Sequence, residues 1–140
     1  MEIRKALSMI LASTACLVFA GCAHVPTTPQ RYGMVIGVKP EKLEYYKQLH
    51  AQPWPSVVKK IRECNIRNYS IYLKQVDNDH WYLFSFFEYV GKDYKKDMAR
   101  MAADPETQRW WKETDPCQVP IPMHTQGEWW STMEEVFHAD

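Results

Sequence analysis

The sequence predicts a single α+β domain of the ferredoxin-like (βαββαβ) type, in which an antiparallel sheet carries helices on one face. Short runs of β-branched and aromatic residues, alternating with polar ones, mark the strands. Between these runs, proline followed by a carboxylate marks the start of helices. The order of the segments, strand, helix, strand, strand, helix, strand, is the order of that fold.

The first 21 residues are typical of a lipoprotein signal peptide and are set apart from the fold. A positively charged start precedes a mostly apolar stretch over residues 6–20, which has the length of a signal-peptide core. Small residues then lead directly into Cys22, so we expect this thiol to be lipidated and to become the first residue of the mature chain. Residues 22–31 are polar and proline-marked and predict a tether. The pattern therefore predicts an exported protein, periplasmic or at the cell surface, that contacts a membrane only through its N-terminal lipid; an ordinary secretory leader or a retained short anchor is the alternative.

About 119 residues follow the leader, which is enough for one domain with a single core. They carry 15 basic and 16 acidic side chains, so they lack the excess of positive charge that is typical of proteins that bind nucleic acids. All six tryptophans and all eight tyrosines lie in this part. These rings are sufficient for both a core and a sugar-stacking pocket.

The first half of the domain reads as a strand followed by two short helices. Residues 32–38 are β-prone, and Pro40 with Glu41 then suits the start of a helix. Pro53 and Pro55 interrupt this helix, and a second helical piece runs from about Pro55 to Glu63. Helical spacing groups four side chains of the first helix: Leu43, Tyr46, Leu49 and His50.

A hairpin is predicted over residues 66–75 and 81–89, because both runs are β-prone and a polar turn at 77–79 joins them. In the first run, Tyr69, Ile71 and Leu73 share one face. Aromatic side chains fall on both faces of this sheet, and neither face can be left bare in water. We therefore expect a homodimer in which two sheets face each other.

The second half adds helices and a last strand. Asp93 can cap a helix that passes through Met101, and the Asp-Pro-Glu sequence at 104–106 starts another that reaches about Thr114. Residues 115–127 contain three prolines and predict no regular element. Residues 130–138 predict the closing strand, although two consecutive glutamates weaken its pattern.

Tyr46 and His50 are four residues apart and project from the same side of the predicted helix. An imidazole exchanges protons near neutral pH, and a neighbouring phenol can orient a substrate oxygen. The spacing alone is equally that of an ordinary packing contact. The pair is thus a candidate acid–base site.

The adjacent Trp110 and Trp111 diverge by about 100° on a helix. One ring can enter the core while the other lines a cavity, or both can pack in a core or an interface. Trp129 and Trp130 leave the same choice open. Tyr69 begins a strand and can offer its hydroxyl to a ligand or serve only as a strand aromatic.

The remaining cysteines and histidines give little information about function. Cys64 and Cys117 fall in separate elements without clustered histidines, so no metal site is expected and a disulfide between them stays open. His80, His124 and His138 have turn, loop and terminal positions and are expected to be solvated.

Taken together, these segments resemble one known family. Residues 31–138 are similar to L-rhamnose mutarotase in five blocks that follow the opening strand in the same order: residues 44–50, 53–55, 68–73, 108–112 and 133–137. The resemblance implies a ferredoxin-like protomer that dimerises through its sheets, a dimeric α/β-barrel. It also implies that His50 is the proton donor and that Tyr46, Tyr69, Trp110 and Trp111 contact the sugar.

By this resemblance the protein is an aldose mutarotase that interconverts the α and β anomers of L-rhamnose or a related 6-deoxy sugar. His50, as imidazolium, would protonate the ring oxygen, while water or a second polar group takes the anomeric proton. No metal or organic cofactor is needed. The leader and the segment from 115 to 130 depart from the simplest family members and leave the sugar open. This segment is expected to lie where a loop can edge the pocket. A non-catalytic sugar- or partner-binding lipoprotein is the alternative, and fold analogy alone adds an oxygenase or haem-handling protein.

Overall fold

A computed structural model describes residues 28–139 and contains one antiparallel sheet. The strands are β1 (Gln30–Val38), β2 (Ile66–Gln75), β3 (Trp81–Tyr89), β4 (Gln118–Val119) and β5 (Ser131–Met133). Their order is β2-β3-β1-β4, and β5 also pairs with β1. This is the predicted ferredoxin-like arrangement, with the last position of the sheet shared by two short strands.

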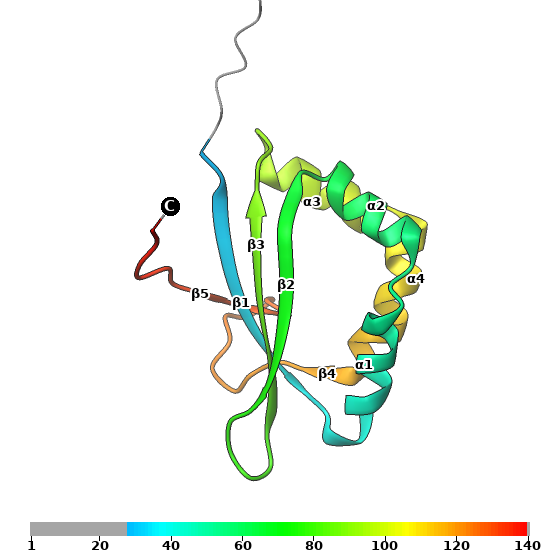
Figure 1. Ribbon diagram of the computed structural model, residues 1–140, viewed down its shortest axis with the longest axis vertical. Helices are drawn as coiled ribbons and strands as arrows, with labels where there is room; N and C mark the ends of the chain where they lie inside the picture. The colour runs from blue at the N-terminus through cyan, green and yellow to red at the C-terminus, as the bar shows by residue number, and fades with distance from the viewer. Residues whose placement is uncertain (1–27, 140) are drawn as a thin grey trace, which may run out of the picture.

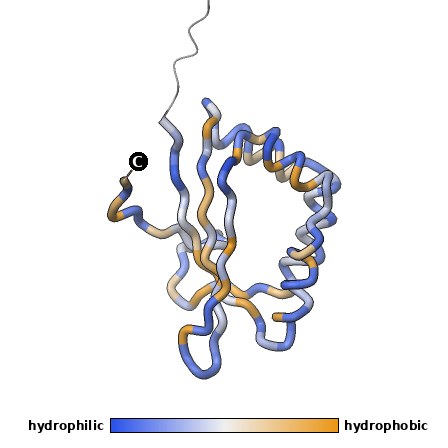
Figure 2. The backbone as a smooth tube through the Cα atoms, in the orientation of Figure 1, coloured by the Kyte–Doolittle hydropathy of each residue, from blue (hydrophilic) through white to orange (hydrophobic). Residues whose placement is uncertain are grey.

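All helices lie on one side of the sheet (Figure 1). They are α1 (Leu43–Ala51), α2 (Pro55–Glu63), α3 (Tyr94–Ala102) and α4 (Pro105–Thr114), with single 3-10 turns at η1 (Pro40–Lys42) and η2 (Asp115–Cys117). Hydrophobic and hydrophilic residues alternate along them, as expected of helices with one face in solvent (Figure 2).

Aspartates cap the two later helices as the sequence predicts. The Asp93 side chain accepts from the backbone N–H of Lys96, and Asp104 accepts from Thr107. Each bond satisfies one of the N–H groups that the first turn of a helix leaves unpaired. The two capping residues thereby fix where α3 and α4 begin.

Strand register divides the sheet into two faces. Across β2, β3 and β1, Leu73, Leu83 and Ile36 are paired neighbours, and they face the helices. One position along, Tyr72, Phe84 and Val35 are paired in the same way and lie on the opposite face, because side chains alternate along a strand. The sheet therefore has an apolar face towards the helices and a second apolar row facing away from them.

A β-bulge interrupts the start of β2. Arg67 pairs with Glu88 and Ser70 with Phe86, so three steps on β2 match two on β3. Asn68, within the bulge, has φ +50°, which is the left-handed region that asparagine tolerates better than most residues. The extra residue resets the alternation, so that Tyr69 turns towards the helices together with Ile71 and Leu73.

Two separate clusters form the core. One contains Ile36, Tyr46, Leu83 and Cys117, and the other contains Cys64, Ile66, Phe87 and Met101. Cys64 and Cys117 are both buried free thiols, one in each cluster. The disulfide that the sequence left open is thus absent.

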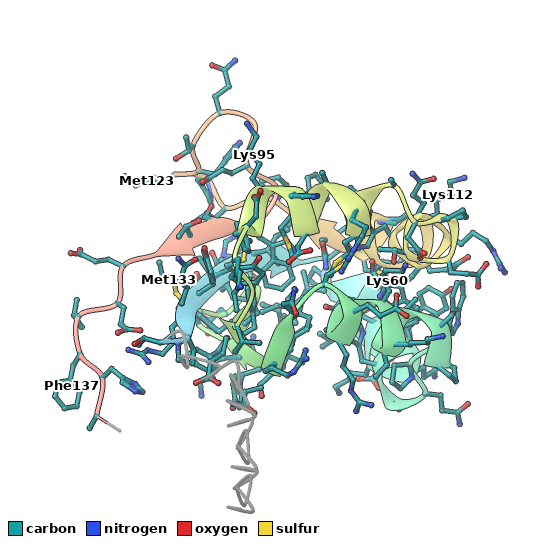
Figure 3. The ribbon with its side chains drawn as sticks, turned by 90° about the horizontal axis from the view of Figure 1, so that it is seen from above. Lys60, Lys95, Lys112, Met123, Met133 and Phe137 are labelled. Atoms are coloured by element: carbon teal, nitrogen blue, oxygen red, sulfur yellow. The ribbon has the colours of Figure 1, made fainter. Side chains whose placement is uncertain are left out.

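The closing segment differs from the prediction. The predicted strand at 130–138 is paired only at Ser131–Met133, and β4 with η2 lies in the segment 115–127 where no element was expected. Two glutamates follow β5, and Glu135 turns to an ion pair with Arg31 at 2.9 Å. The chain beyond leaves the sheet, and Phe137 points away from the domain (Figure 3).

The N-terminal predictions lie mostly outside the described residues, including the leader, Cys22 and most of the tether. The end of that tether is an exception, because β1 already begins at Gln30. Within residues 28–139, none of the helices has the length and apolar character needed to cross a membrane.

Candidate active site

A cavity of about 1120 Å³ lies between the sheet and the helices. Residues from both core clusters line it, including Tyr46 from one and Phe87 from the other. All five predicted site residues are among its lining: His50, Tyr46, Tyr69, Trp110 and Trp111. The structure thus brings together side chains that the sequence distributes over α1, β2 and α4.

His50, in the last turn of α1, is held in one tautomer. Its Nδ1 lies 3.0 Å from the backbone carbonyl oxygen of Tyr46. Because a carbonyl only accepts, Nδ1 carries the hydrogen in the neutral ring and Nε2 keeps its lone pair. Burial lowers the pKa of His50 from its usual value, and the hydrogen bond to the Tyr46 carbonyl opposes this shift. Neutral imidazole is therefore the main form at pH 7, and the imidazolium that forms below it is a stronger acid than a solvated one.

Two aromatic rings pack against the His50 ring. The Tyr46 ring stacks on it at 4.1 Å between centroids, and the Trp110 ring meets it edge-on at 5.3 Å. Trp54, from the turn between α1 and α2, packs edge-on against Trp110 at 5.4 Å. We call these four side chains the ring row. It joins α1 to α4 and restricts the orientations open to the imidazole.

The two site tyrosines stay protonated across the working pH range. Burial raises the pKa of Tyr46, and the nearby Tyr69 hydroxyl adds to this rise. Burial likewise raises the pKa of Tyr69 to about 12. The Tyr69 ring also packs edge-on against Phe87 at 5.7 Å. Both phenols can therefore donate and accept hydrogen bonds, but neither can act as a base near neutral pH.

The adjacent tryptophans diverge as the helical spacing predicts. Trp110 is 7% exposed and belongs to the ring row, whereas Trp111 is 36% exposed. Both nevertheless line the cavity. The other histidines in the described part of the chain, His80, His124 and His138, are exposed outside the cavity, as expected.

One wall of the cavity comes from the segment 115–130, which was expected to edge the pocket although none of its residues was predicted as a site residue. It is formed by Asp115 and Gln118, from the segment judged irregular, together with Trp129. The Trp129 indole N–H donates to Gln118 Oε1 at 2.8 Å. A strand of two residues is too short to show a period, so no pattern in the sequence singles out Gln118 or Asp115 as a site residue.

Asp115 is the single carboxylate among the residues that line the cavity, where Lys47, Arg62 and Arg67 contribute cations. Burial raises the pKa of Asp115, although its contact with Thr114 acts in the opposite direction. Lysine and arginine cannot take up a proton, and the tyrosines hold theirs too tightly to give them up near neutrality. Only His50 and Asp115 can therefore exchange protons in this cavity between about pH 4 and 8. No group of three or more metal-ligating side chains occurs within residues 28–139.

Comparison with known proteins gives the family. Residues 31–139 match the family model described as L-rhamnose mutarotase. The chain belongs to the L-rhamnose mutarotase family. As a family member it is an isomerase that acts on carbohydrates. Relatives described as L-rhamnose mutarotase include one from Oceanobacillus iheyensis, 29% identical over 79% of this chain and 99% of its own length. One from Bacillus subtilis is 30% identical over the same shares.

Solved structures agree with this family fold. The L-rhamnose mutarotase FA22100 from Formosa agariphila is similar with a TM-score of 0.58 and 20% identity, over 79% of this chain and 99% of that one. Tetracenomycin F2 cyclase from Streptomyces glaucescens, a polyketide cyclase, has a TM-score of 0.52 and 13% identity over the same shares. These likenesses confirm the predicted α+β fold of the dimeric α/β-barrel type.

Proposed function

We propose that the protein interconverts the α and β anomers of L-rhamnose or a related 6-deoxy sugar in this cavity, through the open-chain aldehyde. The setting of His50 in the cavity is the observation that supports the proposal. Its Nε2 has no hydrogen-bond partner among the described residues, its ring orientation is held by the ring row, and it lines the cavity. These are the properties required of a group that exchanges a proton with a bound sugar.

Ring opening needs two proton transfers. The His50 imidazolium gives its Nε2 proton to the ring oxygen as the bond between that oxygen and the anomeric carbon breaks. Asp115 removes the proton of the anomeric hydroxyl, and the electron pair of that O–H bond forms the carbonyl of the aldehyde. After rotation about the first carbon–carbon bond, the two transfers run in reverse on the other face of the carbonyl. Acid–base assistance of this kind contributes about 10² to 10⁴-fold.

The remaining site residues bind and orient the sugar. Tyr46 and Tyr69 hold hydroxyl groups with their phenols. Trp111, the more exposed of the adjacent pair, offers its ring to the C–H face of the sugar, while Trp110 supports the imidazole. Neither role needs a metal or an organic cofactor.

Saturation-transfer NMR between the two anomers tests the proposed function. The protein is expected to accelerate exchange of L-rhamnose or another member of a deoxyhexose panel. His50→Ala should lose at least 100-fold of this acceleration and keep part of the sugar binding. His80→Ala, at an exposed hairpin histidine, is the matched control and should accelerate anomer exchange as much as the unaltered protein does. Sugar binding without exchange in the unaltered protein would instead favour the non-catalytic binder.

We also propose that the protein is a homodimer. The row Tyr72, Phe84 and Val35 crosses three strands on the face away from the helices, and Tyr72 is 64% exposed. A second copy that packs sheet against sheet would bury this row on both protomers.

The N-terminal pattern supports a further proposal, that Cys22 is lipidated and holds the exported domain at a membrane. Mass spectrometry of the full chain produced in a bacterium should give a mature protein that begins at Cys22 with acyl chains attached. Cys22→Ser should remove the acyl mass and release the protein from membranes, whereas Cys16→Ser, in the leader, should not. An unmodified mature N-terminus at another residue would contradict lipidation.

A further inference from the structure

The cavity extends along β2 well beyond the candidate active site. Its lining includes both Ile66, the first residue of this strand, and Leu73, near its end. A strand rises about 3.3 Å per residue, so the two positions are roughly 20 Å apart. Pockets of about 300–1,000 Å³ hold ligands much larger than one sugar, and this cavity has about 1120 Å³. A deoxyhexose therefore fills only part of it.

Tyr69 lies between the two parts of the lining. Leu73 packs against the core cluster that contains Tyr46. Ile66 belongs to the other core cluster, together with Phe87, against which the Tyr69 ring packs edge-on at 5.7 Å. A sugar held by the Tyr46 and Tyr69 hydroxyls consequently leaves the part around Ile66 and Phe87 unoccupied.

This second part of the cavity is apolar. Among the described residues that line the cavity and belong to or pack against the second cluster, only Tyr94 carries a hydroxyl group. The others, from β1, β2, β3, α2 and α3, form what we call the apolar compartment: Met34, Ile61, Ile66, Phe87, Met98 and Met101.

The side chains of the apolar compartment do not fully cover one another. Met34, Ile61 and Met98 pack against a core cluster but are only partly buried. Packed protein interiors leave few voids larger than a water molecule, and an empty apolar cavity lowers stability. The compartment thus has the character of a binding site that continues the candidate active site.

The polar residues that line the cavity next to Ile66 are exposed. Arg67 donates to the backbone carbonyl oxygens of Arg62 and Ile66, both at 2.8 Å. Asn68 donates to the Glu88 carboxylate. Arg67 and Asn68 face solvent and therefore lie at the mouth of the cavity, outside the apolar compartment.

These surroundings favour an aliphatic chain over a second sugar unit. Each hydroxyl group of a second sugar would need a hydrogen-bond partner once it left water. Tyr94 can serve only one of them. An alkyl chain needs no such partner, and the flexible methionine side chains adapt to its shape. Ring opening requires a free anomeric hydroxyl, so the chain must be attached to another oxygen of the sugar.

We infer that the cavity takes a 6-deoxy sugar with a short aliphatic acyl group esterified to one of its non-anomeric hydroxyls, and that the apolar compartment binds the acyl chain. This inference rests on the proposed function, because it names the substrate class of the same site. The chain lies far from the reacting atoms, so its burial stabilises the ground state and the transition state alike and acts mainly on KM.

The first test compares substrates in the unaltered protein by saturation-transfer NMR. The probes are the hexanoyl monoesters of L-rhamnose at each hydroxyl other than the anomeric one. Burial of each methylene is worth about fourfold in affinity. At least one ester should therefore have a kcat/KM for anomer exchange at least tenfold above that of L-rhamnose, through a lower KM. A rhamnose disaccharide with a free reducing end is the polar comparison and should show no such gain.

The second test fills the apolar compartment. Met98→Trp places a large ring there and should bring the ratio of kcat/KM, ester over L-rhamnose, down to near one. Met123→Trp makes the same substitution at a side chain that is 91% exposed and outside the cavity, and should keep the ratio of the unaltered protein. Ile61→Phe, from α2, fills the compartment from the other side and decides should Met98→Trp fail to fold.

A third test needs no turnover. In protein labelled with ¹³C at the methionine methyl groups, the preferred ester should shift the signals of Met34, Met98 and Met101, each assigned by its substitution with leucine. L-Rhamnose should leave these signals in place, and the Met123 signal should not move with either ligand.

The outcomes separate this inference from the proposed function. Absence of exchange for every sugar in the unaltered protein overturns the proposed function. Exchange of L-rhamnose with no ester preferred tenfold overturns only the acyl-binding role, as does a disaccharide preferred over every ester. Compartment methionine signals that do not respond to the ester, or an ester preference that survives both filling variants, would likewise contradict binding of the chain in the apolar compartment.

Discussion

The His50 imidazole stacks on the Tyr46 ring at 4.1 Å and bonds through Nδ1 to the backbone carbonyl of the same tyrosine at 3.0 Å. One residue thus sets both the plane and the tautomer of the imidazole. The helical spacing of four residues makes this possible, since the carbonyl at position i and the side chain at i+4 share one face of α1. The nitrogen that remains, Nε2, is the one available for chemistry.

The pH dependence of catalysis should be bell-shaped with its optimum on the acidic side of about pH 6.5. The proposed reactive form has His50 protonated and Asp115 ionised. Burial lowers the pKa of His50, so the rate rises as pH falls towards that pKa. Burial raises the pKa of Asp115, so the rate falls again once this carboxylate takes up a proton. Anomer exchange measured as kcat/KM from pH 4 to 8 gives both limbs; a rate that only increases up to pH 8 is incompatible with this assignment.

Asp115→Asn should lower the rate at the optimum about 100-fold and remove the acidic limb of the profile, because an amide cannot take the anomeric proton. The basic limb, which belongs to His50, should remain. Asp79→Asn, on the exposed hairpin turn, is a matched control that should change neither. An unchanged acidic limb in Asp115→Asn would assign the second proton transfer to water.

Substitutions of the two adjacent tryptophans should have different effects, one on stability and the other on sugar binding. Trp110→Ala empties a buried position of the ring row and should lower the free energy of unfolding by about 3–5 kcal/mol, measured with urea. Trp111→Ala should change it by less than about 1 kcal/mol yet weaken sugar binding in an NMR titration. Equal effects of both variants on unfolding would show that Trp111 is also a core residue.

The bulge at Asn68 should control where Tyr69 points. Asn68→Val places a β-branched side chain at φ +50° and should cost about 1–2 kcal/mol of stability, while Asn68→Gly should not. Both variants lose the side-chain bond to Glu88, so their difference isolates the backbone. Asn68→Val should also raise KM for the sugar. A KM equal to that of Asn68→Gly would mean that the bulge does not control the position of Tyr69.

The dimer proposal predicts that a charge in the outer apolar row separates the protomers. Tyr72→Asp should halve the mass measured by light scattering after size-exclusion chromatography, because two buried carboxylates would face an apolar surface. Gln48→Asp, exposed on α1, should leave that mass unchanged. A monomeric mass for the unaltered domain would end the proposal.

Strong local signals made most of the fold predictable. The caps at Asp93 and Asp104 predicted the starts of α3 and α4, and the alternation around Ile71 predicted that Tyr69, Ile71 and Leu73 share one face of β2. The bulge that aims Tyr69 was not predicted, because one extra residue at Asn68 leaves no mark on the pattern that follows it. The predicted closing strand over residues 130–138 was too long, because β5 ends at Met133, directly before the two glutamates that weaken its pattern.

The site was predictable only in part. Tyr46 and His50 share a helix face, so local spacing brings them together, and family resemblance added Tyr69, Trp110 and Trp111. Gln118 and Asp115 depend on where η2 and β4 are carried by pairing with β1, 80 residues earlier in the chain. Such a long-range contact has no local signature, and a buried glutamine resembles a surface one until its partners are known.

The β4 wall is joined to the sheet at two paired positions, whereas Tyr46, His50 and Trp110 lie on the helices α1 and α4. Asp115, the proposed base, lies in η2 directly before β4, whereas the proposed acid, His50, lies on α1. Substitutions in the segment that follows β4 can change the shape of the cavity without moving the His50 imidazole. New residues between 118 and 130 could then change the sugar preference of this architecture, with the catalytic helix left as it is.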